Sequence, residues 1–379
     1  MSKIRTILIA PANFKGSISP EAAAESIAKG ITSVGKNFKT IQLPLSDGGE
    51  GFVKSLAGAG NGEIIEVEVT GPLYKKVPGC YGRLKNNTAV VEMALASGLE
   101  LIKENEKDPW NATTYGTGEL ILHAINNGAK KVIVGLGGSA TNDGGLGMIQ
   151  ALGAKVLDNK GQPVLSGAKG LENVWEFDLS QLERNIEGVE IVAACDVTNP
   201  LLGPEGASSI YGPQKGADDA MIEKLEYGLT KFNETVEKQL RLYKAETPGV
   251  GAAGGLGFAL VVFLRASLRP GFDIVSQVTN LEDEVRRADL IITGEGKIDD
   301  QTLQGKTIHR LAQLAKKYEK KLLAIGGVVD LQYRDKFYQS GISDFYAIVD
   351  YANGTRDSIE NASDYLRVIG KEIAGQHNL

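Results

Sequence analysis

Residues 135–145 read Gly-Leu-Gly-Gly-Ser-Ala-Thr-Asn-Asp-Gly-Gly and follow the apolar run Val132 to Val134. The run predicts a buried strand, and the three-and-four spacing of apolar residues from Leu146 to Leu152 predicts a helix. Because glycine has no Cβ, a phosphate can approach its N–H group, and a helix N-terminus adds partial positive charge. The segment therefore predicts a strand, an anion-binding loop and a helix. A tight turn that binds no ligand is the alternative.

The bulk composition is that of a globular protein. The chain has 379 residues, a length typical of about two domains, or up to three. Hydrophobic residues are 42% and charged residues 23%, which favours neither a disordered nor a membrane protein. The formal charge is -6 and no basic block is present, so nucleic acid is not an expected partner. The 47 glycines cluster after apolar runs, as is typical of close backbone turns around ligands.

The cysteines and the apolar runs of the sequence indicate the cellular compartment. Cys80 and Cys195 are far apart and match no metal-ligand spacing, so we expect reduced core thiols. The N-terminus has no signal-peptide apolar region, and the longest strongly apolar run, residues 259–264, is too short to span a bilayer. We expect a cytoplasmic protein with no membrane partner, present as a monomer or homodimer.

The N-terminal region alternates strand and helix. Thr6 to Ala10 and Ile41 to Leu45 are apolar runs that predict strands. Between them, Ser19 is placed to cap a helix that has Pro20 in its first turn. The intervening loop, residues 13–17, lies at the carboxyl end of a strand, where open α/β sheets bind ligands.

The middle of the chain has a different texture. Alternation from Glu63 to about Ala94 predicts β-strands, with a hairpin that turns at Asn86-Asn87. Strand patterns recur at residues 191–194, 290–292, 322–325 and 345–349. We predict an α/β fold in which a doubly wound Rossmann-like domain, residues 1–62 plus 285–379, is interrupted by a second α/β domain, residues 63–284. Whether the strands at 132 and 191 belong to the insertion or extend the first sheet stays open.

Two nucleotide motifs nearly fit. Gly135 to Ala140 satisfies the dinucleotide pattern G-x-G-x-x-A, and Asp158 lies near the distance of a ribose-binding acid, which would indicate a dehydrogenase. Residues 158–161, however, resemble a hairpin turn, and residues 142–145 are poor first-turn residues for a helix. Gly305-Lys306-Thr307 resembles the tail of a P-loop, but Asp300 stands where that pattern needs glycine, and a carboxylate there would repel phosphate.

Strand ends carry the parts of a phosphoryl-transfer site. Glycine loops can bind phosphate oxygens, and Lys15 can supply a point charge. Acidic residues lie just beyond predicted strands: Asp47, Asp196, Glu295 and Asp299. Carboxylates bind Mg²⁺, and one can accept the proton of an attacking hydroxyl. For each acid, a turn or helix-capping role is the alternative.

Taken together, the motifs resemble the bacterial-type glycerate kinase family over nearly the whole chain. The motifs that carry the resemblance are residues 14–17 (Phe-Lys-Gly-Ser), 47–51 (Asp-Gly-Gly-Glu-Gly), 115–120 (Tyr-Gly-Thr-Gly-Glu-Leu), 137–145, 195–201, 212–216 (Gly-Pro-Gln-Lys-Gly), 251–257 and 293–299. The first loop departs from the family pattern, because Ala12-Asn13 stands where Asp-Ser is usual. Ala12 cannot bind metal or substrate, so it is assigned no role.

The resemblance implies a kinase that uses ATP and Mg²⁺ to phosphorylate a hydroxyl of D-glycerate, with 2-phosphoglycerate the favoured product and 3-phosphoglycerate the alternative. It implies an active site in the cleft between two α/β domains. A nicotinamide dehydrogenase and a non-catalytic hydroxy-acid or nucleotide sensor are the competing hypotheses.

Site residues follow from the motifs and the resemblance. We expect Asp196, Asp47 and Lys15 to be catalytic, and the two aspartates also to bind the metal. Asp196 follows a buried strand directly and Asp47 lies in a glycine turn, so we rank them ahead of Glu295 and Asp299. The residues expected to bind the nucleotide are Gly137, Gly138, Ser139, Ala140, Asn142 and Ser17. Those expected to bind the substrate are Gly48, Glu295, Lys297 and Asp299.

Overall fold

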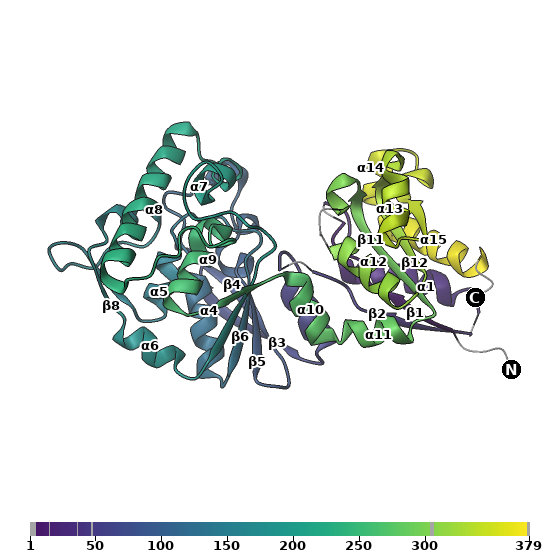
Figure 1. Cartoon of the computed structure of the whole chain (residues 1–379), viewed down its shortest axis with the longest axis horizontal. Helices are drawn as coiled ribbons and strands as arrows, with labels where there is room; N and C mark the ends of the chain where they lie inside the picture. The colour runs from purple at the N-terminus through teal and green to yellow at the C-terminus, as the bar shows by residue number, and fades with distance from the viewer. Residues whose placement is uncertain (1–4, 15, 36, 47, 304–306, 377–379) are drawn as a thin grey trace. The chain divides into compact units, whose positions relative to one another are not determined.

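The computed structural model describes residues 5–14, 16–35, 37–46, 48–303 and 307–376. The chain divides into two compact units. Unit 1 comprises residues 1–46 and 272–379, and unit 2 comprises residues 47–271. The α/β fold class is confirmed, with one sheet domain interrupted by a second (Figure 1).

The described part of unit 1 contains a five-stranded parallel sheet in the order β13-β12-β11-β1-β2. The strands are β1 (Arg5–Ile9), β2 (Phe38–Gln42), β11 (Leu290–Ile298), β12 (Leu322–Val329) and β13 (Asp344–Ala347). Ile7 and Ile9 pack in a core with α1 (Pro20–Thr32) and α15 (Ala362–Gln376). Leu8 points to the other face and is also fully buried, as a doubly wound sheet requires.

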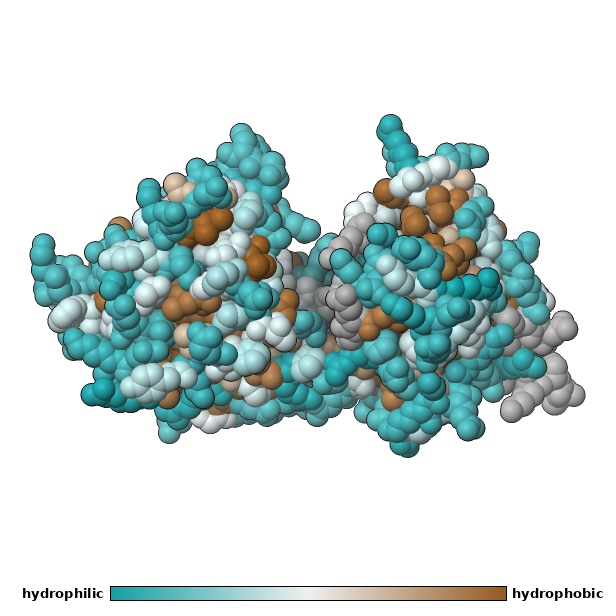
Figure 2. Space-filling view, turned by 45° about the horizontal axis from the view of Figure 1, so that its top comes forward, coloured by the Kyte–Doolittle hydropathy of each residue, from teal (hydrophilic) through white to brown (hydrophobic). Residues whose placement is uncertain are grey.

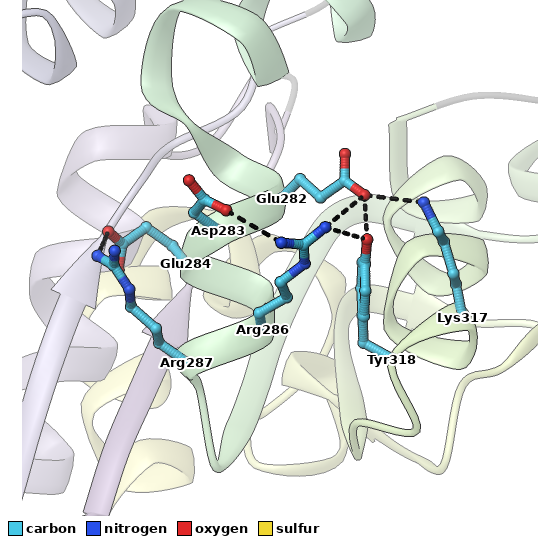
Figure 3. Close-up of polar contacts among 7 residues, drawn as sticks. All are labelled: Glu282, Asp283, Glu284, Arg286, Arg287, Lys317 and Tyr318. Carbon is cyan, nitrogen blue, oxygen red and sulfur yellow. Dashed lines mark hydrogen bonds and ion pairs between the residues drawn. The ribbon is translucent and has the colours of Figure 1, made fainter.

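Unit 1 also contains further helices. They are α10 (Gly271–Thr279), α11 (Leu281–Arg287), α12 (Thr307–Lys317), α13 (Arg334–Ser340) and α14 (Thr355–Glu360). Ion pairs link α11 to the end of α12 (Figure 3). Glu282 accepts a hydrogen bond from Lys317 Nζ at 2.8 Å and another from the Tyr318 hydroxyl, which accepts one from Arg286 at 2.9 Å. The pKa of Glu282 is lowered by its hydrogen bonds with Lys317 and Tyr318.

The described part of unit 2 contains a six-stranded mixed sheet in the order β10-β9-β6-β5-β4-β3, beside a two-stranded one, β7-β8. The strands are β3 (Glu63–Thr70), β4 (Lys76–Arg83), β5 (Thr88–Glu92), β6 (Lys131–Gly135), β7 (Lys155–Leu157), β8 (Glu176–Asp178), β9 (Glu190–Ala194) and β10 (Ser267–Arg269). The strands at 132 and 191 therefore belong to the sheet of unit 2. The four strands β5, β6, β9 and β10 are parallel, so their carboxyl ends share one edge.

The main helices of unit 2 are α2 (Phe52–Ala59), α4 (Tyr115–Asn126), α5 (Leu146–Ala151), α6 (Ser180–Ile186), α7 (Ala207–Tyr211), α8 (Asp219–Leu240) and α9 (Ala252–Phe263). Helix α2 contacts β5, which places it in unit 2, whereas α11 contacts β1 and belongs to unit 1. The unit limits thus fall earlier in the chain than the predicted limits, 62/63 and 284/285.

Most predicted elements have the predicted type, but their limits differ. The α1 cap is confirmed, since Ser19 Oγ accepts from Ala22 N at 3.3 Å. The strand predicted at 290–292 continues to Ile298, because β12 pairs with it through Val329. On the face shown in Figure 2, hydrophilic residues predominate and apolar ones form small separate patches. Within the described ranges, no helix has both the length and the apolar character needed to cross a bilayer.

Candidate active site

The glycine loop after β6 is held by backbone hydrogen bonds on both sides. Gly137 N donates to Gly48 O at 3.1 Å, and Ala140 N donates to Ser97 O at 2.9 Å. A Cβ at Gly137 would lie 2.5 Å from the Cα of Gly49, so the two glycine loops touch backbone to backbone. Within the described part of the chain, no protein oxygen accepts a hydrogen bond from the N–H of Gly138 or Ser139. Two N–H donors are thus available to a ligand.

These donors lie on a cavity of about 180 Å³ inside unit 2. Its walls include Gly137, Gly138, Ser139, Asp196, Tyr211 and Gln214. The cavity lies where β6 and β9 end, at the carboxyl edge of the parallel strands, where α/β sheets bind ligands. A wider hollow of about 790 Å³ lies beside α6 at the amino end of β9, on the opposite edge. The position at the carboxyl edge favours the smaller cavity as the active site.

Asp196 stands at the predicted position, two residues beyond the end of β9. Its side chain is exposed on the cavity wall, and its Oδ1 and Oδ2 accept from Gly271 N at 3.1 and 3.3 Å. The buried strand fixes the backbone and the hydrogen bond orients the carboxylate. The arrangement can present a charged oxygen to a ligand in the cavity.

The start of α5 differs from the prediction. Asp143 is fully buried and accepts from Thr114 N, Thr114 Oγ1, Gly145 N and Gly147 N at 2.8 to 3.2 Å. Met148 N, also in the first turn, donates to Thr114 Oγ1 at 2.9 Å. Because the chain itself satisfies these N–H groups, this helix end offers no positive pole to a ligand, contrary to the prediction. Burial raises the pKa of Asp143, opposed by its hydrogen bonds.

Three other predicted site residues contact the protein itself: Ala140 and Asn142 of this loop, and Gly48 of the neighbouring glycine loop. Ala140 is 1% exposed and is not on the cavity wall. Asn142 is fully buried, and its Nδ2 donates to Ser208 Oγ at 3.1 Å. Gly48 has a φ of +94°, and a Cβ there would lie 2.9 Å from Ala194 Cβ, so the site needs glycine at this position.

The remaining predicted residues lie in unit 1. Ser17 Oγ donates to Ile359 O at 2.8 Å. Glu295, predicted to follow a strand end, lies inside β11, where it pairs with Gly326 and accepts from Thr302 Oγ1 at 2.6 Å. That prediction failed because strand pairing continues past the apolar run. Asp299 does follow the strand end, and its Oδ2 lies 3.0 Å from Lys297 Nζ. Lys15 and Asp47 lie outside the described residues.

Two ionisable residues, Glu92 and Lys215, are buried near the site and were not predicted from the sequence. Glu92, at the end of β5, accepts from Gly51 N at 3.3 Å and Val53 N at 3.2 Å, and so caps α2. Burial raises the pKa of Glu92 to about 7. Lys215, in the 3₁₀ helix Pro213–Lys215, is also fully buried. Charged side chains are almost never fully buried unless they are paired. The residue types of Glu92 and Lys215 therefore gave no indication that they are buried.

Two further observations concern metal and nucleotide motifs. Considering only the residues that the structure describes, His, Cys, Asp and Glu form no group of three or more suited to a metal ion. Asp158 of the dinucleotide motif lies in the predicted hairpin turn, where its Oδ1 accepts from Lys160 N and Gln162 N, both at 2.8 Å. These turn bonds lower the pKa of Asp158, which is partly exposed.

Comparison with known proteins adds independent evidence. Residues 7–378 match the model of the glycerate kinase family. The chain is 44% identical to the glycerate kinase of Bacillus subtilis (strain 168), over 98% of each chain, and 41% identical to the glycerate 2-kinase of Escherichia coli (strain K12), over 97% of each. A crystal structure from Salmonella typhimurium LT2, of a protein assigned as glycerate kinase 2, matches with a TM-score of 0.86 and 40% identity over 99% of each chain. The chain is therefore an enzyme of the glycerate kinase family.

Proposed function

We propose that this enzyme transfers the γ-phosphate of ATP to a hydroxyl of D-glycerate and releases 2-phosphoglycerate. Family membership supports the phosphoryl acceptor, and the E. coli relative named glycerate 2-kinase supports the position of transfer. We also propose that it acts in the cytoplasm, as a monomer or homodimer. The dehydrogenase and sensor hypotheses are not favoured, since the relatives are named kinases.

The observation that carries the proposal is a pair of N–H donors that have no partner among the described residues and share a cavity wall with a carboxylate. Gly138 and Ser139 offer their N–H groups on the same cavity wall that holds Asp196. Donors fixed in this way bind phosphate oxygens with little reorganisation as charge shifts during transfer. Asp196 is proposed either to accept the proton of the attacking hydroxyl or to bind the metal, with Asp47 in the other role. Lys15 is proposed to contact phosphate.

ATP enters such reactions as its magnesium complex. Exposed carboxylate oxygens are the ligand type that Mg²⁺ prefers, so Asp196 fits, and Asp47 is proposed as a second ligand. The ion would neutralise charge on the phosphate oxygens.

Unit 1 supplies the proposed substrate-binding residues. The side chains of Glu295 and Asp299 are ordered by Thr302 and Lys297. Lys297 keeps its ammonium exposed beside Asp299, which raises the pKa of that lysine, so it stays charged and can bind the carboxylate of glycerate. Ser17 is proposed to contact nucleotide, and Gly48 of unit 2 is proposed to contact substrate. Asn142 and Ala140 are buried away from the cavity wall, so their proposed part in nucleotide binding is to support the loop that carries the N–H donors.

A coupled assay tests the proposal. ADP should be released only when D-glycerate, ATP and Mg²⁺ are all present, and NMR of the product should show phosphate on the 2-hydroxyl. Phosphate on the 3-hydroxyl would contradict only the proposed position of phosphate transfer, and the kinase assignment would stand. An absorbance change with a nicotinamide cofactor, or binding without turnover, would overturn the kinase assignment.

A further inference from the structure

Lys215 is a fully buried lysine next to the cavity, and it is not among the residues proposed to bind ligands or catalyse the reaction. Its side chain has no exposed surface, and its Nζ donates to Thr141 O at 2.6 Å. Because a buried ammonium loses its hydration, it persists only with acceptors and counter-charge in the protein.

The Thr141 carbonyl lies at the point where the glycine loop leaves the cavity. Ser139 on the cavity wall is two residues earlier, and the N–H of Ala140 between them is bound to Ser97 O. On its other side, a Cβ at Gly254 would lie 2.0 Å from Thr141 O, so α9 approaches this carbonyl as closely as only glycine permits. Lys215 therefore holds the loop where a small shift would move the cavity wall.

The same lysine belongs to the segment that forms another part of the wall. Tyr211 and Gln214 line the cavity, and Gln214 directly precedes Lys215. The hydrogen bond from Lys215 to Thr141 thus connects two parts of the wall that are 74 positions apart in sequence.

Lys215 also has an electrostatic role. Burial lowers the pKa of Lys215 to about 7, opposed by the charge of Asp143. Asp143 is buried two residues beyond Thr141, and its carboxylate would repel a phosphate bound on the loop. In its protonated form, Lys215 offsets that negative charge.

We propose that Lys215 is a positioning residue for phosphate binding, an inference that rests on the proposed function. Its ammonium fixes the Thr141 carbonyl, which keeps the Gly138 and Ser139 N–H groups at the cavity wall, and it compensates Asp143. Lys215 does not contact substrate itself.

The test compares Lys215→Met and Lys215→Ala with Lys131→Met. Lys131 begins β6, the strand that leads into the glycine loop, and it pairs with Glu190 at the surface, so it controls for loss of a lysine. In Lys215→Met, KM for ATP should rise at least about tenfold, the effect of losing a hydrogen bond to a charged group. KM for D-glycerate should change by less than about threefold, because only phosphate binding depends on the loop. Lys131→Met should match the wild type.

Chemical rescue separates positioning from packing. Propylamine should restore kcat/KM of folded Lys215→Ala, whereas propanol, similar in size and uncharged, should not. Wild-type KM for ATP in folded Lys215→Met, equal rescue by both compounds, or failure of both variants to fold would each overturn the proposal. Absence of turnover in the wild type would instead count against the proposed function.

Discussion

At the scale of single residues, alanine substitutions at two glycines can distinguish an effect on ligand binding from an effect on backbone conformation. Gly138 and Gly161 share a φ of +75°, but Gly161 lies in the hairpin after β7 with nothing within 4 Å of a Cβ. Alanine at either position should cost about 1 to 2 kcal/mol of stability, the penalty of a left-handed conformation. Gly138→Ala should cost somewhat more, because its Cβ would lie 3.0 Å from Ala94 Cβ. Only Gly138→Ala should also raise KM for ATP, by about tenfold, because its methyl group crowds phosphate donors. Equal kinetics of the two variants would reduce the loop at 138 to a packing turn.

The carboxylate at the end of β9 gives the second residue-scale prediction. Asp196→Asn keeps an acceptor for Gly271 N–H and removes the charge. Turnover should fall by about 10²-fold or more, the scale of a lost general base, while thermal stability changes little. Partial rescue by high Mg²⁺ would identify a metal ligand, and absence of rescue would identify a base.

Asp158→Asn serves as the matched control, because Asp158 also accepts backbone N–H groups but lies in a surface turn. It should have wild-type turnover. If Asp196→Asn and Asp47→Asn both keep near wild-type turnover too, the catalytic assignment moves to Glu295 and Asp299.

At the scale of elements, Glu92 joins the end of β5 to the start of α2, and its ionisation makes this junction sensitive to pH. Its folded pKa, about 7, lies above the ordinary 4.5, so it holds its proton more tightly in the folded state. Its contribution to stability is therefore full below about pH 4.5 and lost as pH rises through about 7. Relative to Glu92→Gln, the wild type should lose roughly 3 kcal/mol of unfolding free energy between these limits.

Urea unfolding at a series of pH values measures this difference. Glu190→Gln removes a surface carboxylate and controls for general charge effects. Parallel pH curves for the wild type and Glu92→Gln would show that Glu92 does not titrate in this way.

The elements also show what the sequence could predict. The hairpin between β4 and β5 and the cap of α1 depend on neighbouring residues, and both were predicted. The extension of β11 through Gly294 and Glu295 was not, because those residues have low strand propensity and their pairing with β12 depends on a distant part of the chain. In the candidate site, the position of Asp196 could be predicted because the residue comes just after a buried apolar strand. Burial of Glu92 depends on Gly51, 41 positions away, and no local pattern reveals it.

At the scale of the whole molecule, the two units differ in how the chain builds them. Unit 2 is one continuous segment with its own sheet and core, whereas unit 1 needs both ends of the chain. A fragment of residues 47–271 should therefore fold cooperatively alone, as judged by circular dichroism and a single thermal transition. Residues 272–379 alone should not, because β11 loses its partner β1. A stably folded C-terminal fragment would contradict this division.

The place of β1 inside the sheet has a consequence for biosynthesis. Its partner β11 arrives late, since Thr6 and Asp289, which are joined by a hydrogen bond at the start of this pair, are 283 positions apart. At about 5 to 20 residues per second, a ribosome needs roughly 15 to 60 seconds to cover that distance. During this time unit 2 can fold, while the apolar strand Arg5–Ile9 waits with one sheet edge unpaired. The nascent chain thus carries an aggregation-prone N-terminus for most of its synthesis, and it is the segment that a ribosome-bound chaperone would shield.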